Sequence, residues 1–436
     1  MFVSYCFLLF VSYFTAGIHS HGIEESSKMF GYVGSAQRLG TAVDVSTDGK
    51  FAVLGAPTYQ TKGGVLLYDV LQKKSIVYLV GSNSTISANQ GSSAAISDTG
   101  YTVAFGGPTE GVSGSAWVWS QTGDSPAITG TWIQETKLVP ADAVGDARFG
   151  HSVDMSRTGN TVVVGGPSDN SGIGAFWVFV RTVGSEWVPQ GGKVVGTGAV
   201  GASGSRQGSS VSISGNGLTI AVGGWMDDNY RGATWVFLID PDTNIWNQQG
   251  LKLVYPGLSE QAMQGSSVSL SNDGKVLAVG AQNDALTIGA VCMFTRSEGG
   301  EWTPAQKLVG TGSTANPNVF QGWSVGLAGD ASKLVIGANA DNATVGASWF
   351  FARNAEGVYE QHSRKLVGSG YVGLPSQGYA VSMSGNGKVF LVGGPDHATR
   401  DGAVWVYTLP TSTASIDCGM NVLWGLVGLF MVVINI

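Results

Sequence analysis

Residues 208–223 read GSSVSISGNGLTIAVG, and this pattern decides the fold. From Ser210 to Ser214, polar and apolar residues alternate with a period of two, as they do in a half-buried strand. Asn216-Gly217 follows, a pair that favours the positive φ angles of a tight hairpin. An apolar run then leads to Gly223. The segment therefore predicts a β-hairpin that begins and ends at a glycine.

The same arrangement recurs seven times along the chain. Each unit begins at an anchor glycine, and the anchors are Gly40, Gly91, Gly150, Gly208, Gly265, Gly322 and Gly378. A second glycine follows 15 residues later, at Gly55, Gly106, Gly165, Gly223, Gly280, Gly337 and Gly393. A third follows at 23 or 24 residues, at Gly64, Gly114, Gly174, Gly232, Gly289, Gly346 and Gly402. An internal repeat of this length indicates a solenoid, a propeller or another repeat array.

Two further strands complete each unit. The third is typified by Ala233-Thr234-Trp235-Val236-Phe237, and the fourth begins near Trp302 and ends at Lys307-Leu308-Val309-Gly310. Seven units of four short antiparallel strands predict an all-β, seven-bladed β-propeller over residues 29–409. The period is longer than the 40–45 residues or so of WD repeats. The third-strand tryptophans are expected in the core between blades: Trp117, Trp177, Trp235, Trp349 and Trp405.

The last unit lacks a fourth strand, because the repeat pattern ends at Pro410. Near the N-terminus, Tyr32-Val33-Gly34-Ser35 is similar to Leu366-Val367-Gly368-Ser369 in unit six. We therefore expect the N-terminal segment to supply the missing strand of the last blade. Pairing the first and last segments would close the ring and leave no exposed sheet edge.

These motifs resemble the FG-GAP repeat family, whose best-known members are the integrin alpha-chain propellers. Phe149-Gly150 with Gly165-Gly166-Pro167 matches the name-giving pattern, and Gly55-Ala56-Pro57 spells its second half. The likeness covers residues 29–409 and is closer to a calcium-free branch in microbial secreted proteins. Integrin-type repeats bind calcium between the first two strands, where this chain has only a short turn such as Ser271–Gly274. Such a turn is too short to supply six to eight oxygen ligands, so we expect no metal and no cofactor.

Composition excludes other classes. The net charge is −7 without a basic block, so nucleic acid is not an expected partner. Only Cys292 of the three cysteines lies within the repeats, which rules out a disulfide framework. Stability must come from packing and backbone pairing.

Both ends of the sequence carry apolar segments. Residues 1–20 read as a signal peptide, with a buried first strand as the alternative. Residues 410–421 form a polar spacer, and residues 422–436 form an apolar tail. Small residues around Ser412 make it a candidate attachment site for a GPI anchor; a membrane-inserted tail helix and an unanchored tail are the alternatives. The sequons at Asn83 and Asn342 fall in connections and suit glycosylation in the secretory pathway.

An acidic residue recurs 19 positions after the anchor, at Glu110, Asp169, Asp227, Asp284 and Asp341, with Asp396 one position early in unit seven. Such a ring could bind cations or amines, but its repetition favours a structural role in capping each turn. Positions that break the repeat are better candidates for binding. The predicted ligand-binding set is Trp225, Asp227, Asp228, Tyr230, Arg231 and Trp323. His151 and Tyr379 occupy the register of Trp323 and are expected to pack at the channel.

Three functions remain open. The favoured one is a binding or adhesion propeller at the cell surface or outside the cell, recognising protein or glycan through its long-loop face. Aromatic and arginine side chains beside carboxylates suit such recognition. A secreted carbohydrate-active enzyme using carboxylates on that face and a structural coat protein are the alternatives. We expect no enzyme activity, because His151, His362 and His397 show no triad or metal-ligand spacing.

Overall fold

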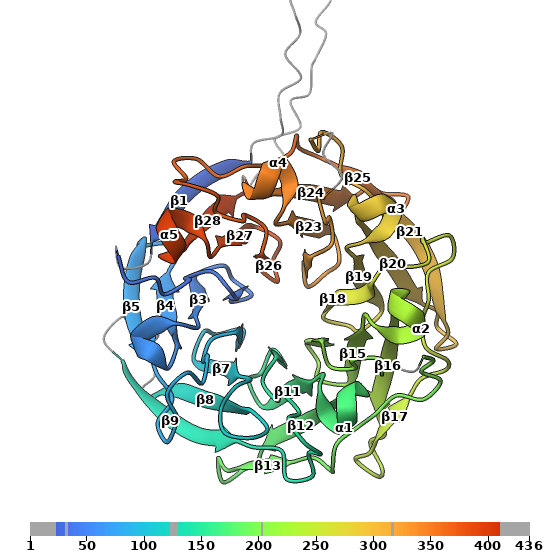
Figure 1. Cartoon of the computed structure of the whole chain (residues 1–436). Helices are drawn as coiled ribbons and strands as arrows, with labels where there is room; N and C mark the ends of the chain where they lie inside the picture. The colour runs from blue at the N-terminus through green and yellow to red at the C-terminus, as the bar shows by residue number, and fades with distance from the viewer. Residues whose placement is uncertain (1–22, 31–33, 123–129, 202–203, 315–317, 410–436) are drawn as a thin grey trace, which may run out of the picture.

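The computed structural model describes residues 23–30, 34–122, 130–201, 204–314 and 318–409. These residues form seven four-stranded antiparallel sheets arranged as blades around a central axis (Figure 1). The predicted seven-bladed propeller is therefore confirmed. The predicted signal peptide, spacer, apolar tail and Ser412 lie outside the described residues. Among the residues that are described, no helix has the length and apolar character needed to cross a membrane.

Blades one to four each run from the axis outward in chain order. Blade one has β2 (Val43–Val45), β3 (Phe51–Ala56), β4 (Gly64–Asp69) and β5 (Lys74–Leu79), with a 3₁₀ turn at Tyr59–Thr61. Blade two has β6 (Ser93–Ile96), β7 (Thr102–Gly107), β8 (Ser115–Thr122) and β9 (Thr131–Leu138). Blade three has β10 (Ser152–Met155), β11 (Thr161–Gly166), α1 (Asp169–Gly172), β12 (Ala175–Arg181) and β13 (Trp187–Pro189). Blade four has β14 (Ser210–Ile213), β15 (Thr219–Gly224), α2 (Asp227–Tyr230), β16 (Ala233–Ile239) and β17 (Trp246–Gln248).

Blades five and six repeat this order, and blade seven completes the ring. Blade five has β18 (Gln264–Leu270), β19 (Val276–Ala281), α3 (Asp284–Thr287), β20 (Ala290–Arg296) and β21 (Trp302–Leu308). Blade six has β22 (Ser324–Leu327), β23 (Lys333–Ala338), α4 (Asp341–Thr344), β24 (Ala347–Arg353) and β25 (Tyr359–Gln361). Blade seven has β26 (Ala380–Met383), β27 (Val389–Gly394), α5 (His397–Arg400), β28 (Ala403–Thr408) and the N-terminal strand β1 (Glu24–Phe30).

The N-terminal strand closes the ring, but it lies upstream of the predicted segment. β1 pairs antiparallel with β28, and Lys28 lies opposite Trp405. In blade two, Lys137 of the fourth strand lies opposite Trp117 in the same way. Lys28 is therefore the equivalent of the fourth-strand lysine, and the predicted match at residues 32–35 was wrong. The tryptophan–lysine register would have located the strand where the Val-Gly-Ser similarity misplaced it.

The glycine registers mark places where neighbouring blades touch. The anchor Gly208 has a φ of +83°, and a Cβ there would lie 2.3 Å from the Ala175 carbonyl oxygen of blade three. The second glycine, Gly223, would place a Cβ 2.1 Å from the carbonyl oxygen of Gly265, the next anchor. Both distances are far below van der Waals contact, so a side chain at either position would push the blades apart. The repeat is thus a record of blade-to-blade packing.

The third-strand tryptophans lie between blades, as predicted. Trp235 is completely buried, and its indole N–H donates to the Thr197 carbonyl at 2.8 Å, in the connection from the previous blade. Gln207, just before the anchor, holds the same connection through both amide atoms, at 2.6 and 2.9 Å from Gly196. Packing and buried hydrogen bonds therefore join each blade to the next.

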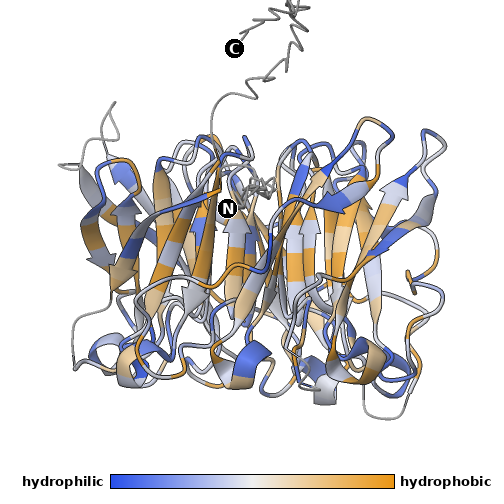
Figure 2. Ribbon diagram, turned by 90° about the horizontal axis from the view of Figure 1, so that it is seen from above, coloured by the Kyte–Doolittle hydropathy of each residue, from blue (hydrophilic) through white to orange (hydrophobic). Residues whose placement is uncertain are grey.

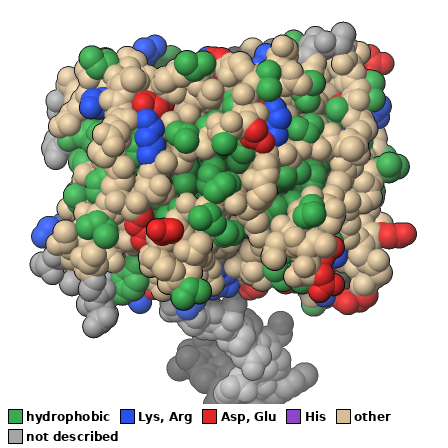
Figure 3. Space-filling view, turned by 90° about the horizontal axis from the view of Figure 1, so that it is seen from below, with side chains coloured by type: hydrophobic (Ala, Val, Ile, Leu, Met, Phe, Trp, Pro, Cys, Tyr) green, Lys and Arg blue, Asp and Glu red, His purple; other side chains and the backbone are tan. Residues whose placement is uncertain are grey.

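The five short helical segments all lie on one face of the ring (Figure 2). Each lies between the second and third strands and contains residues in the left-handed region, such as Asp228 and Asn229, with φ of 49° and 54°. Figure 3 shows one flank of the ring, where acidic and basic groups are scattered among apolar and uncharged ones. The face that carries the short helices is the long-loop face predicted to bind ligands.

Candidate binding site at the mouth of the central channel

The recurring acidic residue of each unit belongs to an internal clamp. Asp227 is completely buried, and its carboxylate accepts the N–H of Val200 at 2.7 Å and forms an ion pair with Lys252. The same pairing joins Glu110 to Lys137, Asp169 to Lys193, Asp284 to Lys307 and Asp341 to Lys365. The N–H comes from the connection before the anchor, so the acid joins two segments where we had expected it to cap its own turn. Asp227 is thus closed to ligands from solvent.

The first residues after the anchor glycines surround a cavity on this face. It has a volume of about 680 Å³ and is lined at that register by Thr41, Ser92, His151, Ser209, Ser266, Trp323 and Tyr379, one from each blade. Residues two before and 17 after the anchor, such as Arg38 and Trp225, widen the rim. We call this cavity the mouth. Its size lies within the range of small-ligand pockets.

Aromatic side chains form two parts of the wall of the mouth. Trp323 of blade six and Tyr379 of blade seven have ring centroids 5.6 Å apart. Trp225 of blade four also lines the mouth. The ring centroid of Tyr230 lies 5.7 Å from that of Trp225, and 39% of the surface of Tyr230 is exposed. His151 and Tyr379 were expected to pack at the channel, and the structure shows both facing this cavity. Sequence analysis thus identified four of the aromatic groups at this site.

The predicted ligand-binding residues are divided among three environments. Trp225 and Trp323 face the mouth, with Tyr230 behind Trp225. Asp228 and Arg231 line a separate pocket of about 310 Å³ with Glu260, and their charged groups are 4.0 Å apart. With Asp227 in the clamp, the six residues do not form one site.

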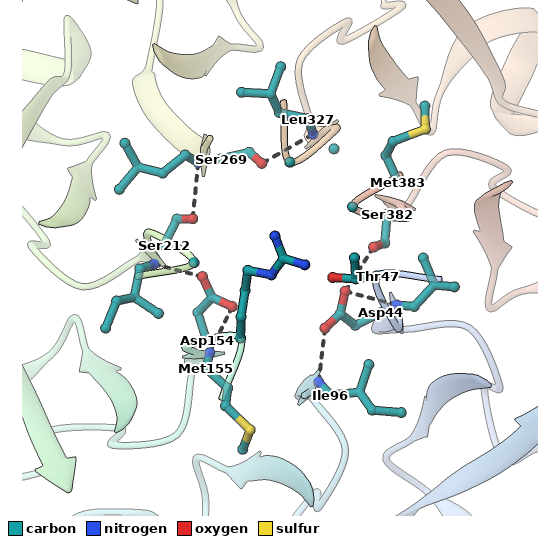
Figure 4. Close-up of a pocket in the computed structure, with 18 of the residues that line it drawn as sticks. Asp44, Thr47, Ile96, Asp154, Met155, Ser212, Ser269, Leu327, Ser382 and Met383 are labelled. Atoms are coloured by element: carbon teal, nitrogen blue, oxygen red, sulfur yellow. Dashed lines mark hydrogen bonds between the residues drawn. The ribbon is translucent and has the colours of Figure 1, made fainter. Parts of the chain in front are cut away.

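Three carboxylates line the other end of the channel, and sequence analysis missed them. Asp98 pairs with Arg157. Asp44 and Asp154 lie four residues after their anchors, in a register where blades four, five and seven have Ser212, Ser269 and Ser382 (Figure 4). Asp44 accepts the Ile96 N–H at 2.9 Å, and Asp154 accepts the Ile213 N–H at 2.7 Å, so each joins its blade to the next. In the sequence, aspartate in a register where three other units have serine could have identified Asp44 and Asp154 as candidates.

The pKa values of Asp44 and Asp154 are both raised. Loss of hydration raises the pKa of Asp44 to about 6, against the effect of its hydrogen bonds. The pKa of Asp154 rises to about 7, first through burial and then through the charge of Asp44. Within the described residues, no three acidic, histidine or cysteine side chains form a group able to hold a metal. The carboxylates act in this structure as acceptors that connect blades.

Comparisons with known proteins agree with this architecture. The family model of the FG-GAP repeat matches residues 132–179, which run from the fourth strand of blade two to the third strand of blade three. The comparison with curated proteins found no match.

Three solved structures show the same overall arrangement. A candidate 6-phosphogluconolactonase of Bacteroides uniformis is 15% identical, with a TM-score of 0.52 over 81% of this chain and 88% of its own. Its counterpart from Bacteroides fragilis is also 15% identical, with a TM-score of 0.53 over 81% and 90%. The RRP9 WD40 repeats are 12% identical, with a TM-score of 0.54 over 89% and 98%. At such identities the likeness concerns the fold alone.

Proposed function

Since the chain is a β-propeller of the FG-GAP repeat family, we propose that it is a binding module that recognises a saccharide unit of a glycan in the mouth. Propellers present loops from every blade around one opening, which suits recognition of a ligand on the axis. The mouth is small and concave, whereas a protein partner would need a contact of about 800 Å² on each side. A glycan end group fits such a cavity better than a folded protein surface does.

One observation carries this proposal. Trp225 and Trp323 are the only tryptophans among the residues that line the mouth, and each replaces a smaller residue in its register of the repeat. Flat aromatic faces beside hydroxyl and amide groups suit the alternating apolar and polar faces of a sugar ring. Ser209, Ser266 and Gln282 supply such polar groups in the same cavity. The two tryptophans that depart from the repeat therefore stand where they could stack against a bound sugar ring.

Hydrolysis receives less support than binding. Glycoside hydrolysis generally uses two carboxyl groups beside the scissile bond, and the lining of the mouth contains neither aspartate nor glutamate. At the other end of the channel, Asp44 and Asp154 accept backbone N–H groups and Asp98 pairs with Arg157. A binding role is thus favoured over an enzymatic one.

Display outside the cell is part of the same proposal. Asn83 and Asn342 are both exposed, and both lie in connections, as attachment of a glycan would require. Export through the N-terminal segment and anchoring through the apolar tail would place the mouth toward glycans of the surroundings. Release by phosphatidylinositol-specific phospholipase would test the anchor.

Replacement of Trp323 by alanine tests the binding site. We expect the variant to lose at least tenfold in affinity on a glycan panel probed with the full-length protein, because the stacking face is removed. Trp132→Ala is the matched control, since Trp132 lies on β9 of the outer rim and is half-buried. Equal binding by the wild type and Trp323→Ala would reject the mouth as the site, provided that both variants unfold at the same temperature as their parent.

A further inference from the structure

Three registers of the repeat define the chemistry of the mouth. These are the positions two before, one after and 17 after each anchor, and they supply nearly all of its lining. None of these 21 positions holds aspartate or glutamate, although the chain has 30 acidic residues against 23 lysines and arginines. The net charge of the protein is −7. The registers that line the mouth therefore carry no negative side chain, although the protein as a whole is acidic.

Cationic groups gather at these positions on blades one, three and four. Arg38, Arg148 and Arg206 share the position two before the anchor, and all three have positive φ, at 57°, 54° and 58°. Of the three, Arg38 lines the cavity, as His151 does. Arg148 and Arg206 hold the same register on blades three and four. Loss of hydration first, and then the charges of Arg148 and Arg206, lower the pKa of His151 to about 4, so both cations act on the space around this side chain.

The three arginines differ in how far they are neutralised. Arg38 pairs with Asp396 at 3.1 Å, and Arg148 lies 3.9 Å from Asp146. Arg206 donates to the Ser168 hydroxyl at 2.8 Å, and no ion pair to it is found within the described ranges. Arg206 thus keeps most of its charge for an incoming group.

Two of the three basic positions lie across the ring from the main aromatic wall, whereas Arg38 belongs to blade one, which lies next to blade seven (Figure 1). Arg206 and His151 belong to blades four and three, and Trp323 and Tyr379 belong to blades six and seven (Figure 1). A sugar stacked on Trp323 would direct its far substituents toward Arg206. Guanidinium groups bind carboxylates and sulfate-like oxyanions through paired hydrogen bonds.

We propose that the ligand of the mouth is an acidic saccharide, whose carboxylate or sulfate group is bound by Arg206 while its ring stacks on Trp323. This inference rests on the proposed saccharide-binding function and specifies its ligand class. A cationic saccharide would meet arginine and histidine with no carboxylate in the lining. A neutral saccharide would leave the charge of Arg206 unused.

Calorimetric titration of the full-length protein tests the proposal with three tetrasaccharides. Hyaluronan supplies carboxylates, chondroitin sulfate adds sulfate esters, and chitotetraose is neutral. We expect at least one acidic probe to bind tenfold or more tightly than chitotetraose, and to weaken as salt is raised from 50 to 300 mM. The comparison of hyaluronan with chondroitin sulfate shows which acidic group is read.

Arg206→Gln should weaken the acidic probe about tenfold to a hundredfold, the usual effect of losing a charged hydrogen bond. Arg231→Gln is the matched control, because Arg231 lies on the same face but lines a separate pocket and stands outside the three registers of the mouth. Equal affinity of the two variants, or tighter binding of chitotetraose, would overturn the acidic ligand and leave saccharide binding intact. Failure of all three probes to bind would overturn both proposals.

Discussion

Blades six and seven perform the same closure with different chemistry. In blade six, Lys365 pairs with the buried carboxylate of Asp341 at 2.6 Å, and the Thr314 N–H donates to the other oxygen. In blade seven, the equivalent lysine is Lys28, and the equivalent acidic position holds His397. The Lys28 ammonium lies 3.1 Å from the imidazole Nε2 and 2.5 Å from the Gly370 carbonyl oxygen. An ion pair has been exchanged for a cation held by neutral acceptors.

The carboxylate has not disappeared from blade seven but has moved along the chain. Asp401, four residues after His397, accepts the N–H groups of Gly34 and Ala36 at 2.8 and 3.0 Å. It therefore binds the segment that follows β1, while Lys28 also lies 4.5 Å from the Phe30 ring centroid. Blade seven is the only one whose outer strand comes from the far end of the chain, so its side chains must secure a strand that no hairpin holds. We call the junction between β1 and β28 the seam. The comparison shows that the side-chain contacts that hold the seam differ from those that hold the fourth strand in the other blades.

Removing β1 should have the largest effect. Deletion of Glu24–Phe30 exposes the edge of β28 and removes Met29 from the hydrophobic core that blades seven and one share. We expect the deleted protein to lose its cooperative unfolding transition, because an unpaired sheet edge and an open ring remain. Circular dichroism during heating measures this.

A synthetic peptide of Glu24–Phe30 provides the control for this deletion. If the strand only completes the sheet, the added peptide should restore a transition in a concentration-dependent way. A deleted protein that unfolds at the wild-type temperature without peptide would contradict closure by β1.

Breaking the two clamps should separate the ordinary blade from the seam. Asp341→Asn leaves Lys365 beside a neutral group in a site where the acid is completely buried, and should cost about 3 kcal/mol. His397→Asn preserves a neutral acceptor for Lys28 and should cost about 1 kcal/mol. Urea titration gives both values. Equal losses would show that the seam depends on charge pairing as much as blade six does.

Acid should weaken the seam through His397. Burial lowers the pKa of His397, and the charge of Lys28 lowers it further; a hydrogen bond from the imidazole to the Gly370 backbone and the charge of Asp401 act in the opposite direction. The unfolded chain regains the ordinary pKa of about 6.5, so it takes up the proton first as the pH falls. The stability from neutral His397 is complete above pH 6.5 and is lost below it.

Exchange of the two residues tests this pH dependence. His397→Asp gives the seam the clamp of blade six and should gain about 1 kcal/mol over the wild type at pH 5.5, with a smaller gain at pH 7.5. Asp341→His should carry the acid sensitivity into blade six. Urea midpoints at the two pH values measure both differences. If His397→Asp gained the same stability over the wild type at pH 5.5 and at pH 7.5, protonation of His397 would not explain the loss of stability in acid.

The sequence predicted the scaffold well because packing repeats. Glycine registers and hairpin turns recur in every unit and the buried tryptophans in five of the seven, so a chance pattern could be separated from a structural one. The closing strand was misplaced because Lys28 is recognisable only by its register opposite Trp405, which is a relation between the two ends of the chain. The mouth was found in part, since Trp225 and Trp323 break the repeat visibly. Asp227 was misjudged because its partner Lys252 is 25 residues away and belongs to another strand connection.

A second departure from the repeat should show the opposite pH dependence, with a smaller effect. Asp154 stands where blades four, five and seven have serine, and Ser212 accepts the next blade's Leu270 N–H at 3.1 Å. Because the folded protein raises the pKa of Asp154 to about 7, it binds the proton before the unfolded chain does, and stability falls as the pH rises from about 4 through 7. Asp154→Ser should therefore stabilise the protein by about 1 kcal/mol at pH 8 and by less at pH 4, as urea midpoints would show. A loss of stability at pH 8 would mean that the two hydrogen bonds of the carboxylate outweigh its lost hydration. Acid would then also weaken the blade contacts made by Asp44 and Asp154, and not the seam alone.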